Sequence, residues 1–394
     1  METEDVVKLK TISNKTDSDS NNIDNYSSKN KNYDLTKYLY ILIPIVLLAI
    51  IIINISYFLN NNKEKDKNKS DNKPNSNIEV LKVVREIEDT LIFDENMKEK
   101  YKKELNDFCK NQDKYFKKDI ENQLTIANIS LLSNVFKMYV YSSNDYVSQE
   151  ILTCFSWEFD ETNNLLNALF FYSTIYNLKP HEIYILDIGA NIGWYSLFIA
   201  KYGYNVLSFE PSEIHNYIFK KNYCLNRELN ITIINKGLYD DEKKCNYYTF
   251  EENKAYGTVF CDENKNISKH LKKSGQVHLT KLSNYIPFLL NKKLVLMKIK
   301  IDGSEGKAIE GGIKLITKYH IPFIFLEFNP EGLEKHGIDP IKFLKMFLKY
   351  GYKFPDNNFF DSEFLSINDI MEKTNGTLNL YIVQNRINKK YHDI

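Results

Sequence analysis

The hydrophobic and polar positions divide the chain into three parts. Residues 38–59 read YLYILIPIVLLAIIIINISYFL, an uncharged and almost wholly apolar run about as long as a bilayer-spanning helix requires. Residues 1–37 and 60–77 are rich in Asn, Ser, Asp and Lys, so neither stretch buries enough apolar surface to fold. We therefore expect a disordered tail, one transmembrane helix in a lipid bilayer, and a linker. A cleaved signal peptide fits less well, because a long polar stretch precedes the run and no A-x-A site follows it.

Residues 78–149 show apolar side chains at helical spacing among charged ones, which favours a helical stem or N-terminal extension. From residue 150 to 388, β-prone runs alternate with helical patterns. This alternation predicts an α/β fold with a mostly parallel central sheet flanked by helices. The near-continuous apolar runs Leu294–Met297 and Phe323–Leu326 fit strands that are buried on both sides, and Leu378–Val383 is expected to add a last strand.

The candidate chemistry begins where a β-prone run ends in Asp187 and passes through Gly189, Asn191 and Gly193 into an apolar helical pattern. Glycine lets the backbone turn sharply and approach a ligand, and asparagine tolerates left-handed dihedrals. The next β-prone run, Asn205–Phe209, is followed by Glu210, a carboxylate suited to binding ribose hydroxyls. Both strand ends are expected to point into one crevice.

Two cofactor classes use such a strand, glycine turn and helix. A dinucleotide fingerprint has a third glycine where this chain has Trp194, which argues against an NAD-dependent oxidoreductase. Asp187 instead suits a cofactor with a cationic amino-acid portion, because a carboxylate attracts the ammonium group or the amides around it. This favours S-adenosylmethionine as the cofactor.

The motifs LDIGANIGWYSLFIAKYG, SFEPSEIHNYIFKKNYCLN, INKGLYDDE, LMKIKIDGSEGKAIEGG and IFLEFNP, in this order, resemble the FkbM family of class I S-adenosylmethionine-dependent methyltransferases. The resemblance covers residues 150–385. It implies a Rossmann-like class I methyltransferase fold that methylates a hydroxyl, often of a sugar, glycan or similar small-molecule acceptor. By position, the resemblance assigns cofactor binding to Asp187, Gly189, Asn191, Gly193, Glu210, Asn235, Gly237 and Leu238.

The fourth-strand motif departs from the family. The family usually reads Lys-Ile-Asp-Val-Glu-Gly-x-Glu, whereas this chain has Lys300 in place of the aspartate and Asp302 in place of the first glutamate. We expect Asp302 or Glu305 to contact the acceptor, with Lys300 as a substitute base if its pKa is lowered. Glu327, in an otherwise apolar run, needs a partner or a ligand. The alternative is a catalytically inactive methyltransferase-like module that binds ligands and is tethered to the membrane.

Composition narrows the function classes further. The 52 basic and 52 acidic side chains give no net charge at pH 7, which argues against a nucleic-acid partner. Five cysteines, odd in number and widely spread, indicate neither a disulfide-rich scaffold nor a CxxC-type zinc site. The seven histidines form no HExxH pair, so we expect no tightly bound metal.

Two signals bear on the location of the chain and they disagree. More lysines follow the apolar run than precede it, which slightly favours a cytosolic C-terminal part. The sequons that begin at Asn68, Asn128, Asn230, Asn266 and Asn375 fit a lumen instead. Our expectation is a single-pass, type II membrane protein of the secretory pathway, in the ER or Golgi.

Overall fold

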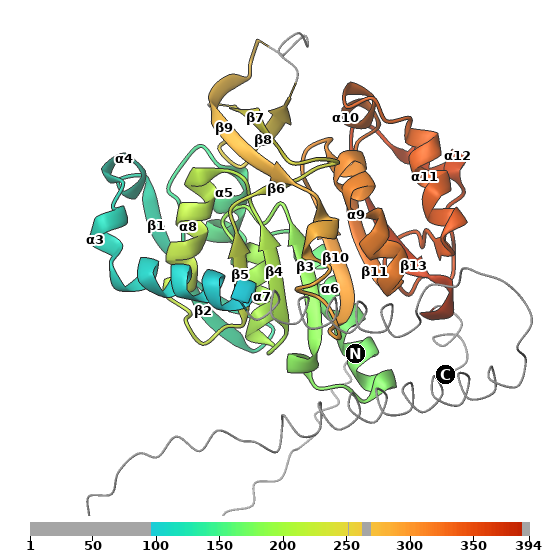
Figure 1. Ribbon diagram of the computed structural model, residues 1–394, viewed down its shortest axis with the longest axis horizontal. Coiled ribbons are helices and arrows are strands. Elements are labelled where there is room, and N and C mark those ends of the chain that lie inside the picture. Colours follow the sequence, from blue (N-terminus) through green and yellow to red (C-terminus); the bar gives the residue numbers. More distant parts are fainter. Residues whose placement is uncertain (1–95, 251, 262–268, 388–394) are drawn as a thin grey trace, which may run out of the picture. The chain divides into compact units, whose positions relative to one another are not determined.

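The computed structural model describes residues 96–250, 252–261 and 269–387 (Figure 1). The chain divides into two units, Met1–Val83 and Val84–Ile394, and every described residue belongs to the second. The expected tail, the transmembrane helix over 38–59 and the linker lie outside the described residues. Within the described ranges, no helix is both long enough and apolar enough to span a membrane.

A seven-stranded sheet forms the centre of the second unit, with the spatial order β12-β13-β11-β10-β3-β4-β5. Five neighbouring strands, from β11 to β5, are parallel, and β13 runs antiparallel to both of its neighbours. The seven strands are β3 (Ile183–Ile188), β4 (Asn205–Phe209), β5 (Ile231–Ile234), β10 (Lys293–Ile299), β11 (Phe323–Phe328), β12 (Tyr352–Lys353) and β13 (Leu378–Gln384). The mostly parallel α/β sheet predicted from the sequence is confirmed.

Both faces of this sheet are covered, as the apolar runs predicted. Along β3, Ile183 and Ile185 belong to one hydrophobic core, whereas Leu186 and Ile188 belong to a second core on the opposite face. Helices α6 (Phe159–Tyr176), α7 (Trp194–Lys201) and α8 (Glu213–Cys224) contribute to the first core. The second core contains residues of α9 (Glu305–Tyr319), α11 (Pro340–Lys349) and α12 (Ile367–Lys373).

The strand order places a topological switch point between β3 and β10. The chain runs from β3 outward through β4 to β5, and then returns to the other side of β3 to form β10 and β11. In open sheets of this kind, ligands bind outside the carboxyl ends of the strands where the order reverses. The ends of β3 and β10 therefore mark the expected site.

A second, four-stranded sheet with the order β6-β9-β7-β8 is inserted between β5 and β10. In Figure 1 it lies beyond the carboxyl ends of the central strands, and a disulfide joins Cys245 to Cys261 within it. Its strands are β6 (Gly237–Leu238), β7 (Lys243–Thr249), β8 (Gly257–Phe260) and β9 (Lys272–Thr280). This sheet covers the crevice at the switch point.

The residues before the central sheet differ from the expected helical stem over 78–149. A helical stretch over 96–110 and the short helices α3 (Gln112–Tyr115) and α4 (Lys118–Glu121) agree with it, but β1 (Leu124–Leu131) and β2 (Asn134–Tyr141) form an antiparallel hairpin. Buried and exposed side chains alternate along the inner part of each strand, which is a period of two. The helical pattern of the neighbouring residues obscured this local alternation.

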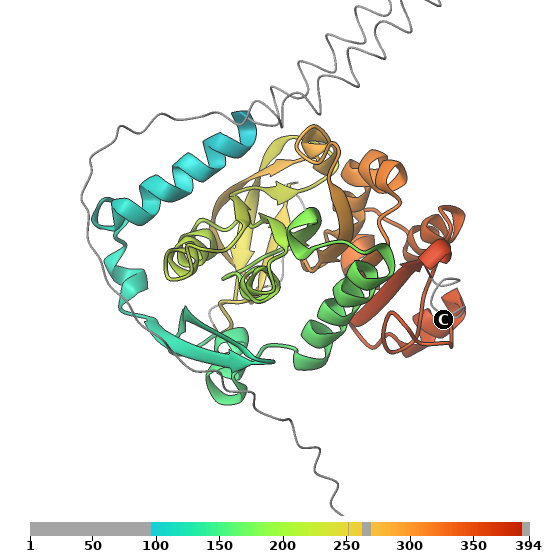
Figure 2. The same ribbon diagram turned by 90° about the horizontal axis from the view of Figure 1, so that it is seen from below.

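This N-terminal part is fastened to the central domain. Residues 96–110 lie beside α8 (Figure 2), and a disulfide joins Cys109 to Cys224. The hairpin packs on α8 as well, and α5 (Tyr146–Cys154) follows it. The remaining elements are the 3₁₀ helices η1 (Pro180–Glu182) and η2 (Leu282–Tyr285) and the helix α10 (Pro330–Lys335).

Candidate active site

The glycine turn between β3 and α7 needs its glycines for two different reasons. Gly189 has a φ of +78°, and a Cβ added there would lie 2.0 Å from the carbonyl oxygen of Lys300. Gly193 has a φ of +95°, and its Cβ would lie 2.2 Å from the ring of Phe219. Asn191, between them, also has a positive φ of 51°. Gly189 thus permits close approach of the β10 end, and Gly193 permits close packing of α8.

Asp187 lies beneath this turn and not in a pocket. Its side chain is buried; one carboxylate oxygen lies 3.1 Å from Nζ of Lys298, and the other accepts a hydrogen bond of 2.6 Å from Ser196 Oγ. Lys298 Nζ in turn donates to the Gly189 carbonyl at 2.7 Å. This buried pair fixes the carbonyl side of the turn, which is a different task from the direct cofactor contact expected for Asp187.

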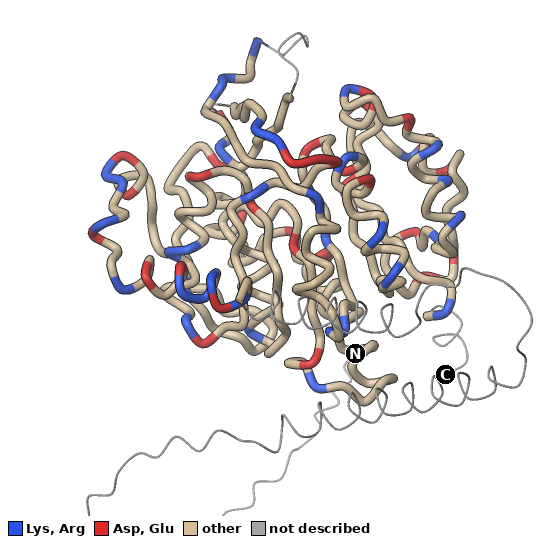
Figure 3. The backbone as a smooth tube through the Cα atoms, in the orientation of Figure 1, with Lys and Arg blue, Asp and Glu red and all other residues tan. Residues whose placement is uncertain are grey.

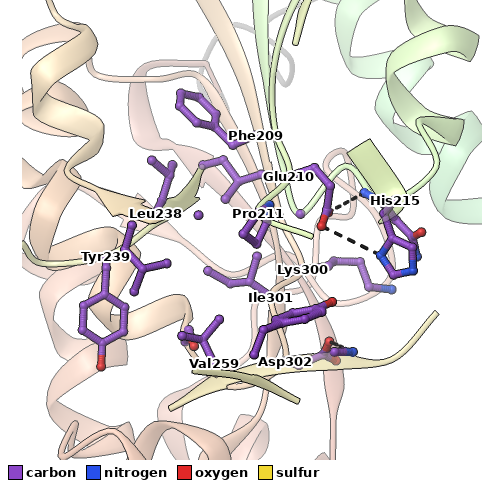
Figure 4. A pocket seen from close by; sticks show the side chains of 18 of the residues that line it. Phe209, Glu210, Pro211, His215, Leu238, Tyr239, Val259, Lys300, Ile301 and Asp302 are labelled. Carbon is purple, nitrogen blue, oxygen red and sulfur yellow. Dashed lines mark hydrogen bonds and ion pairs between the residues drawn. The ribbon is translucent and has the colours of Figure 1, made fainter. Parts of the chain in front are cut away.

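Glu210, at the end of β4, joins two loops. Its carboxylate accepts hydrogen bonds of 2.8 Å from the backbone N–H groups of Asn191 and Ser212. Burial raises the pKa of Glu210 to about 7, although these N–H groups and Lys298 oppose the rise. His215 Nδ1 lies 3.8 Å from the carboxylate (Figure 4), but burial lowers the pKa of His215 to about 4. Near neutral pH His215 is therefore uncharged and does not neutralise Glu210.

The first pocket, of about 630 Å³ including space open to solvent, lies at the carboxyl ends of β3, β4 and β10. Figure 4 shows Glu210 and Leu238 on its walls, and Val259 of β8 contributes to its roof. Seven of the predicted site residues line this pocket: Gly189, Asn191, Glu210, Gly237, Leu238, Lys300 and Asp302. The structure thus brings together residues from three strand ends and from β6, as a shared crevice requires.

Four predicted site residues do not line this pocket: Asp187, Gly193, Asn235 and Glu305. The side chain of Asn235 is exposed, and its Nδ2 donates to the carbonyl oxygens of Glu210 at 2.9 Å and Pro211 at 3.2 Å. It lines a separate groove beside α8. Asn235 therefore braces the loop that follows β4, at a position from which it does not reach into the first pocket.

The second pocket, of about 890 Å³ including space open to solvent, adjoins the first. The two pockets share Gly189, Asn191, Ala255, Lys300 and Asp302. The remaining lining of the second pocket combines carboxylates with aromatic rings, among them Trp157, Glu158, Tyr256 and Glu327. The two pockets therefore adjoin at the end of β10.

Lys300, at this junction, is held by carboxylates from two other elements. Its Nζ pairs with Glu158, which precedes α6, and lies 3.4 Å from Oε1 of Glu327 on β11. Burial alone lowers the pKa of Lys300, but the two carboxylates outweigh burial and the net pKa is raised. This environment favours the charged ammonium, which has no lone pair to accept a proton, and so argues against Lys300 as a base.

Asp302 and Glu305 follow β10 but have different surroundings. Asp302 lines both pockets, and burial, followed by the charge of Glu327, raises its pKa to about 7. Glu305 is 1% exposed, lines neither pocket, and accepts a hydrogen bond of 2.9 Å from the Ile301 N–H. Burial raises the pKa of Glu305 to about 8. Asp302 is thus placed to meet a ligand, whereas Glu305 closes the turn that carries Asp302.

Comparison with known proteins now adds to this geometry. Residues 187–354 match the family described as the methyltransferase FkbM domain. This match identifies a methyltransferase domain within the chain. Its cofactor is S-adenosylmethionine. A search of curated proteins finds no significant match to the chain.

Solved structures of methyltransferases resemble the chain only distantly. The co-crystal structure of WbdD with a kinase inhibitor has a TM-score of 0.33 and 10% identity over 57% of this chain, which spans only 40% of that protein. TYW2 of M. jannaschii with AdoMet has a TM-score of 0.29 and 13% identity, covering 66% of this chain and 84% of that one. The T. thermophilus 16S rRNA methyltransferase RsmC has a TM-score of 0.30 and 11% identity, covering 67% of this chain and 51% of that one. Similarity of this degree does not extend those proteins' activities to this chain.

The residues of the first pocket fit S-adenosylmethionine. Each Glu210 oxygen accepts one backbone N–H and retains a lone pair for a ribose hydroxyl. Oδ1 of Asn191 is buried, lies at both pockets and has no hydrogen-bond partner among the described residues, so it is available to a donor of the cofactor. Gly189 lines both pockets with backbone atoms alone, because it carries no side chain.

The sequence identified most of this site. It missed Glu158, the role of Lys298 and the pairing of Glu327 with Lys300. Glu158 precedes the matched family region, in a stretch with no motif. Lys298 is part of the fourth-strand motif, yet nothing in a linear pattern shows that it neutralises Asp187. The isolated carboxylate of Glu327 in an apolar run was the one usable signal, and its partner is Lys300.

Proposed function

We propose that the protein is an S-adenosylmethionine-dependent O-methyltransferase that acts on a hydroxyl of a sugar, glycan or similar acceptor. The observation that carries this proposal is the position of Asp302, a carboxyl group with a pKa of about 7 at the junction of the two pockets. A base with a pKa near the working pH is the most effective at removing a hydroxyl proton.

Each pocket has a task in this proposal. S-adenosylmethionine, when bound, supplies a methyl group carried on a cationic sulfur. Glu210 and Asn191 hold the cofactor in the first pocket, and the second pocket holds the acceptor. Asp302 would accept the proton that the acceptor hydroxyl loses as the hydroxyl oxygen takes the methyl group that the cofactor supplies. Alignment of these atoms and exclusion of water supply most of the acceleration.

The first test is calorimetric titration of the full-length chain with S-adenosylmethionine and S-adenosylhomocysteine. We expect micromolar binding that Glu210→Gln weakens, because the replacement amide places an N–H group against backbone donors. Glu334→Gln, an exposed carboxylate on α10, is the matched control and should bind normally. A folded chain that binds neither ligand would refute the proposal. Folding is checked by thermal unfolding of each variant.

The second part of the proposal is a membrane-anchored enzyme with its domain in the lumen of the secretory pathway. Two observations support it: the disulfides Cys109–Cys224 and Cys245–Cys261 require an oxidising compartment, and the sequon residues Asn128, Asn230 and Asn375 are exposed. In sealed microsomes we expect the domain to resist added protease until detergent is present. Digestion without detergent would place the domain on the cytosolic side.

A catalytically inactive binding module is the second candidate, and the ion pairs of Lys300 favour it. The family's aspartate is absent from this position, and the lysine that replaces it is held by Glu158 and Glu327. This candidate predicts cofactor binding without transfer of a labelled methyl group to any hydroxylated acceptor. Transfer that Asp302→Asn abolishes would exclude it.

A further inference from the structure

The loop between α5 and α6 holds Glu158 at the second pocket in an unfavourable backbone conformation. Phe155 and Glu158 have φ angles of +57° and +44°, in the left-handed region that bulky side chains avoid. The Glu158 N–H donates to Glu150 Oε1 at 3.0 Å, and Tyr195 Oη donates to Glu158 Oε2 at 2.5 Å. Left-handed residues persist where neighbouring groups hold them, and they are frequent at ligand sites. These contacts fix the direction in which Glu158 points.

Charge in the second pocket is not balanced. Glu158 and Glu327 both contact Lys300, so two negative groups share one positive group. Lys298, which also lines the pocket, is neutralised by Asp187. Asp302 adds a further negative charge whenever it loses its proton. Elsewhere in the described chain, acidic and basic residues are interspersed (Figure 3), so this excess is local to the pocket.

Aromatic rings complete the lining of this pocket. Trp157 and Tyr256 are partly exposed there, and Tyr146 is 70% exposed at its edge. Flat rings pack against the apolar C–H face of a cyclic ligand. Carboxylates accept hydrogen bonds from hydroxyl groups, and such charge-assisted bonds are stronger than neutral ones. The combination suits an uncharged ring that carries several hydroxyls.

An acidic acceptor meets the opposite situation. Lys300 offers the nearest positive charge, but binding an anion there requires that the ammonium give up one of its two carboxylates. The released carboxylate would then lie close to the new anion. Like charges at such distances in a partly buried site repel strongly.

We propose that Glu158 and Glu327 are the specificity-determining residues of the second pocket, and that they select an uncharged polyhydroxylated ring as acceptor and reject an anionic one. This inference rests on the proposed methyltransferase function, whose substrate class it names. Glu327 and Glu158 act in two ways. They accept hydrogen bonds from the hydroxyl groups of the methyl acceptor, and they keep Lys300 from binding an acidic group. Glu158 lies outside the matched methyltransferase region and Glu327 lies within it, so the N-terminal part of the chain contributes to this specificity.

The experiment uses the full-length chain in detergent, methyl-tritiated S-adenosylmethionine and a mixed pool of oligosaccharides. The pool is separated by anion exchange into neutral molecules and molecules that bear carboxylates, and a portion of the acidic fraction is amidated to remove its charge. We expect the neutral fraction to be labelled at least about tenfold faster than the acidic one, since one unfavourable charge contact corresponds to a factor of this order. Amidation should restore labelling of the same skeletons.

Two variants test the residues themselves. Glu327→Gln and Glu158→Gln should each reduce the preference for neutral over acidic acceptors by about tenfold, while calorimetry shows unchanged binding of S-adenosylmethionine. Glu334→Gln is the control and should keep the full preference. A purely structural ion-pair network would lower the thermal stability of the variants but leave the preference ratio as it was.

Three results would overturn the inference while leaving the cofactor site intact. These are faster labelling of the acidic fraction, no effect of amidation, and no labelling of any oligosaccharide by a chain that binds S-adenosylmethionine. A chain that does not bind the cofactor would instead refute the proposed function, and this inference with it. Calorimetry on the same preparation distinguishes the two failures.

Discussion

In the first pocket, Asn191 and Glu210 come from neighbouring segments of the chain, whereas the charged groups of the second pocket come from segments far apart in the chain. In the first pocket, the turn after β3 and the carboxylate after β4 interact directly through the Asn191 N–H and Glu210. In the second, Glu158, Lys300 and Glu327 come from a loop before α6, the end of β10 and the carboxyl end of β11. The two pockets meet at Asp302.

This difference separates the tasks of the two pockets. A cofactor common to many enzymes can be held by one local arrangement of backbone groups, which any acceptor specificity can share. Acceptor specificity depends on side chains, and these can be contributed by elements outside the shared domain. Changes in the two pockets should therefore have separable effects on cofactor affinity, turnover and acceptor choice.

The largest expected effect is that of Asp302→Asn at the junction. An amide cannot take the hydroxyl proton, so turnover should fall by about 10²–10⁴-fold, as for loss of other general bases. Binding of S-adenosylmethionine should change little, because Glu210 and Asn191 remain. Single-turnover methyl transfer and calorimetry on the same preparation measure the two quantities.

Glu305→Gln is the matched comparison for Asp302→Asn. Glu305 lines neither pocket, and glutamine retains an oxygen that can accept the Ile301 N–H. Turnover should therefore stay within a few-fold of the unmodified chain. The reverse pattern, with Glu305→Gln inactive and Asp302→Asn active, would move the base to Glu305.

The next largest effect is expected from Gly189→Ala in the first pocket. The new Cβ would lie 2.0 Å from the Lys300 carbonyl oxygen, at a φ of +78°. Backbone strain and overpacking together should destabilise the fold by about 3 kcal/mol. If the turn moves instead, the affinity for the cofactor should fall by about 100-fold. Urea unfolding and calorimetry measure these changes.

Gly376→Ala separates backbone strain from the clash. Gly376 has a φ of +86° but nothing within 4 Å of an added Cβ. This variant should lose only about 1 kcal/mol, which is the strain alone. Equal losses in the two alanine variants would show that the close approach of β10 to the turn does not matter.

These comparisons also show what the sequence reveals and what it leaves hidden. The β-prone run that ends in Phe209 matches β4 at both ends, and Leu378–Val383 became β13 with one further residue, because buried strands leave continuous apolar runs. The turn at Gly189 was predicted because only glycine tolerates its dihedrals and its close neighbour. The hairpin Leu124–Tyr141 was missed because its alternation is short and lies between helical patterns.

Charged partners were hidden for a different reason. The Asp187–Lys298 pair and the contact of Glu158 with Lys300 join residues more than 100 positions apart in the chain. Periodicity records which face of an element is buried, but not which side chain lies opposite it. The role of Lys300 as a paired ammonium therefore depended on the three-dimensional structure.

A pH series is expected to separate turnover from stability. Turnover should change by about tenfold per pH unit. Burial raises the pKa values of Glu210 and Asp302 to about 7, so the folded chain keeps protons there that the unfolded chain has lost. Turnover should therefore rise with pH until about 7. The free energy of unfolding should fall as the pH rises from about 4 to about 8, because the folded state binds more protons at Glu210, Asp302 and Glu305 than it loses at the neutral His215.

Asp302→Asn is the control for the stability part of this series. The variant lacks one of the three carboxyl groups with a raised pKa, so its free energy of unfolding should fall less steeply over the same window. Chemical unfolding from about pH 4 to about pH 9 gives the slopes. Parallel slopes for the variant and the unmodified chain would show that Asp302 titrates alike in both states and is not the group proposed here.

The smallest effect is expected from the roof of the first pocket. The disulfide Cys245–Cys261 ties β7 to the residue that follows β8, and β8 supplies Gly257 and Val259 to the pocket. Without the bond, the small sheet opens more readily, and cofactor binding must then order it. The double variant Cys245→Ser with Cys261→Ser should therefore bind S-adenosylmethionine a few-fold more weakly.

The unpaired and exposed Cys154 provides the control for this pair. Cys154→Ser removes a sulfur without altering either disulfide and should leave cofactor affinity unchanged. The second pocket also receives Ala255 and Tyr256 from the connection between β7 and β8. The double variant should therefore also show a lower preference for neutral over acidic acceptors. Weaker cofactor binding with an unchanged preference for neutral over acidic acceptors would show that this connection serves the first pocket alone. Glu158 and Glu327 would then keep their selectivity without the disulfide.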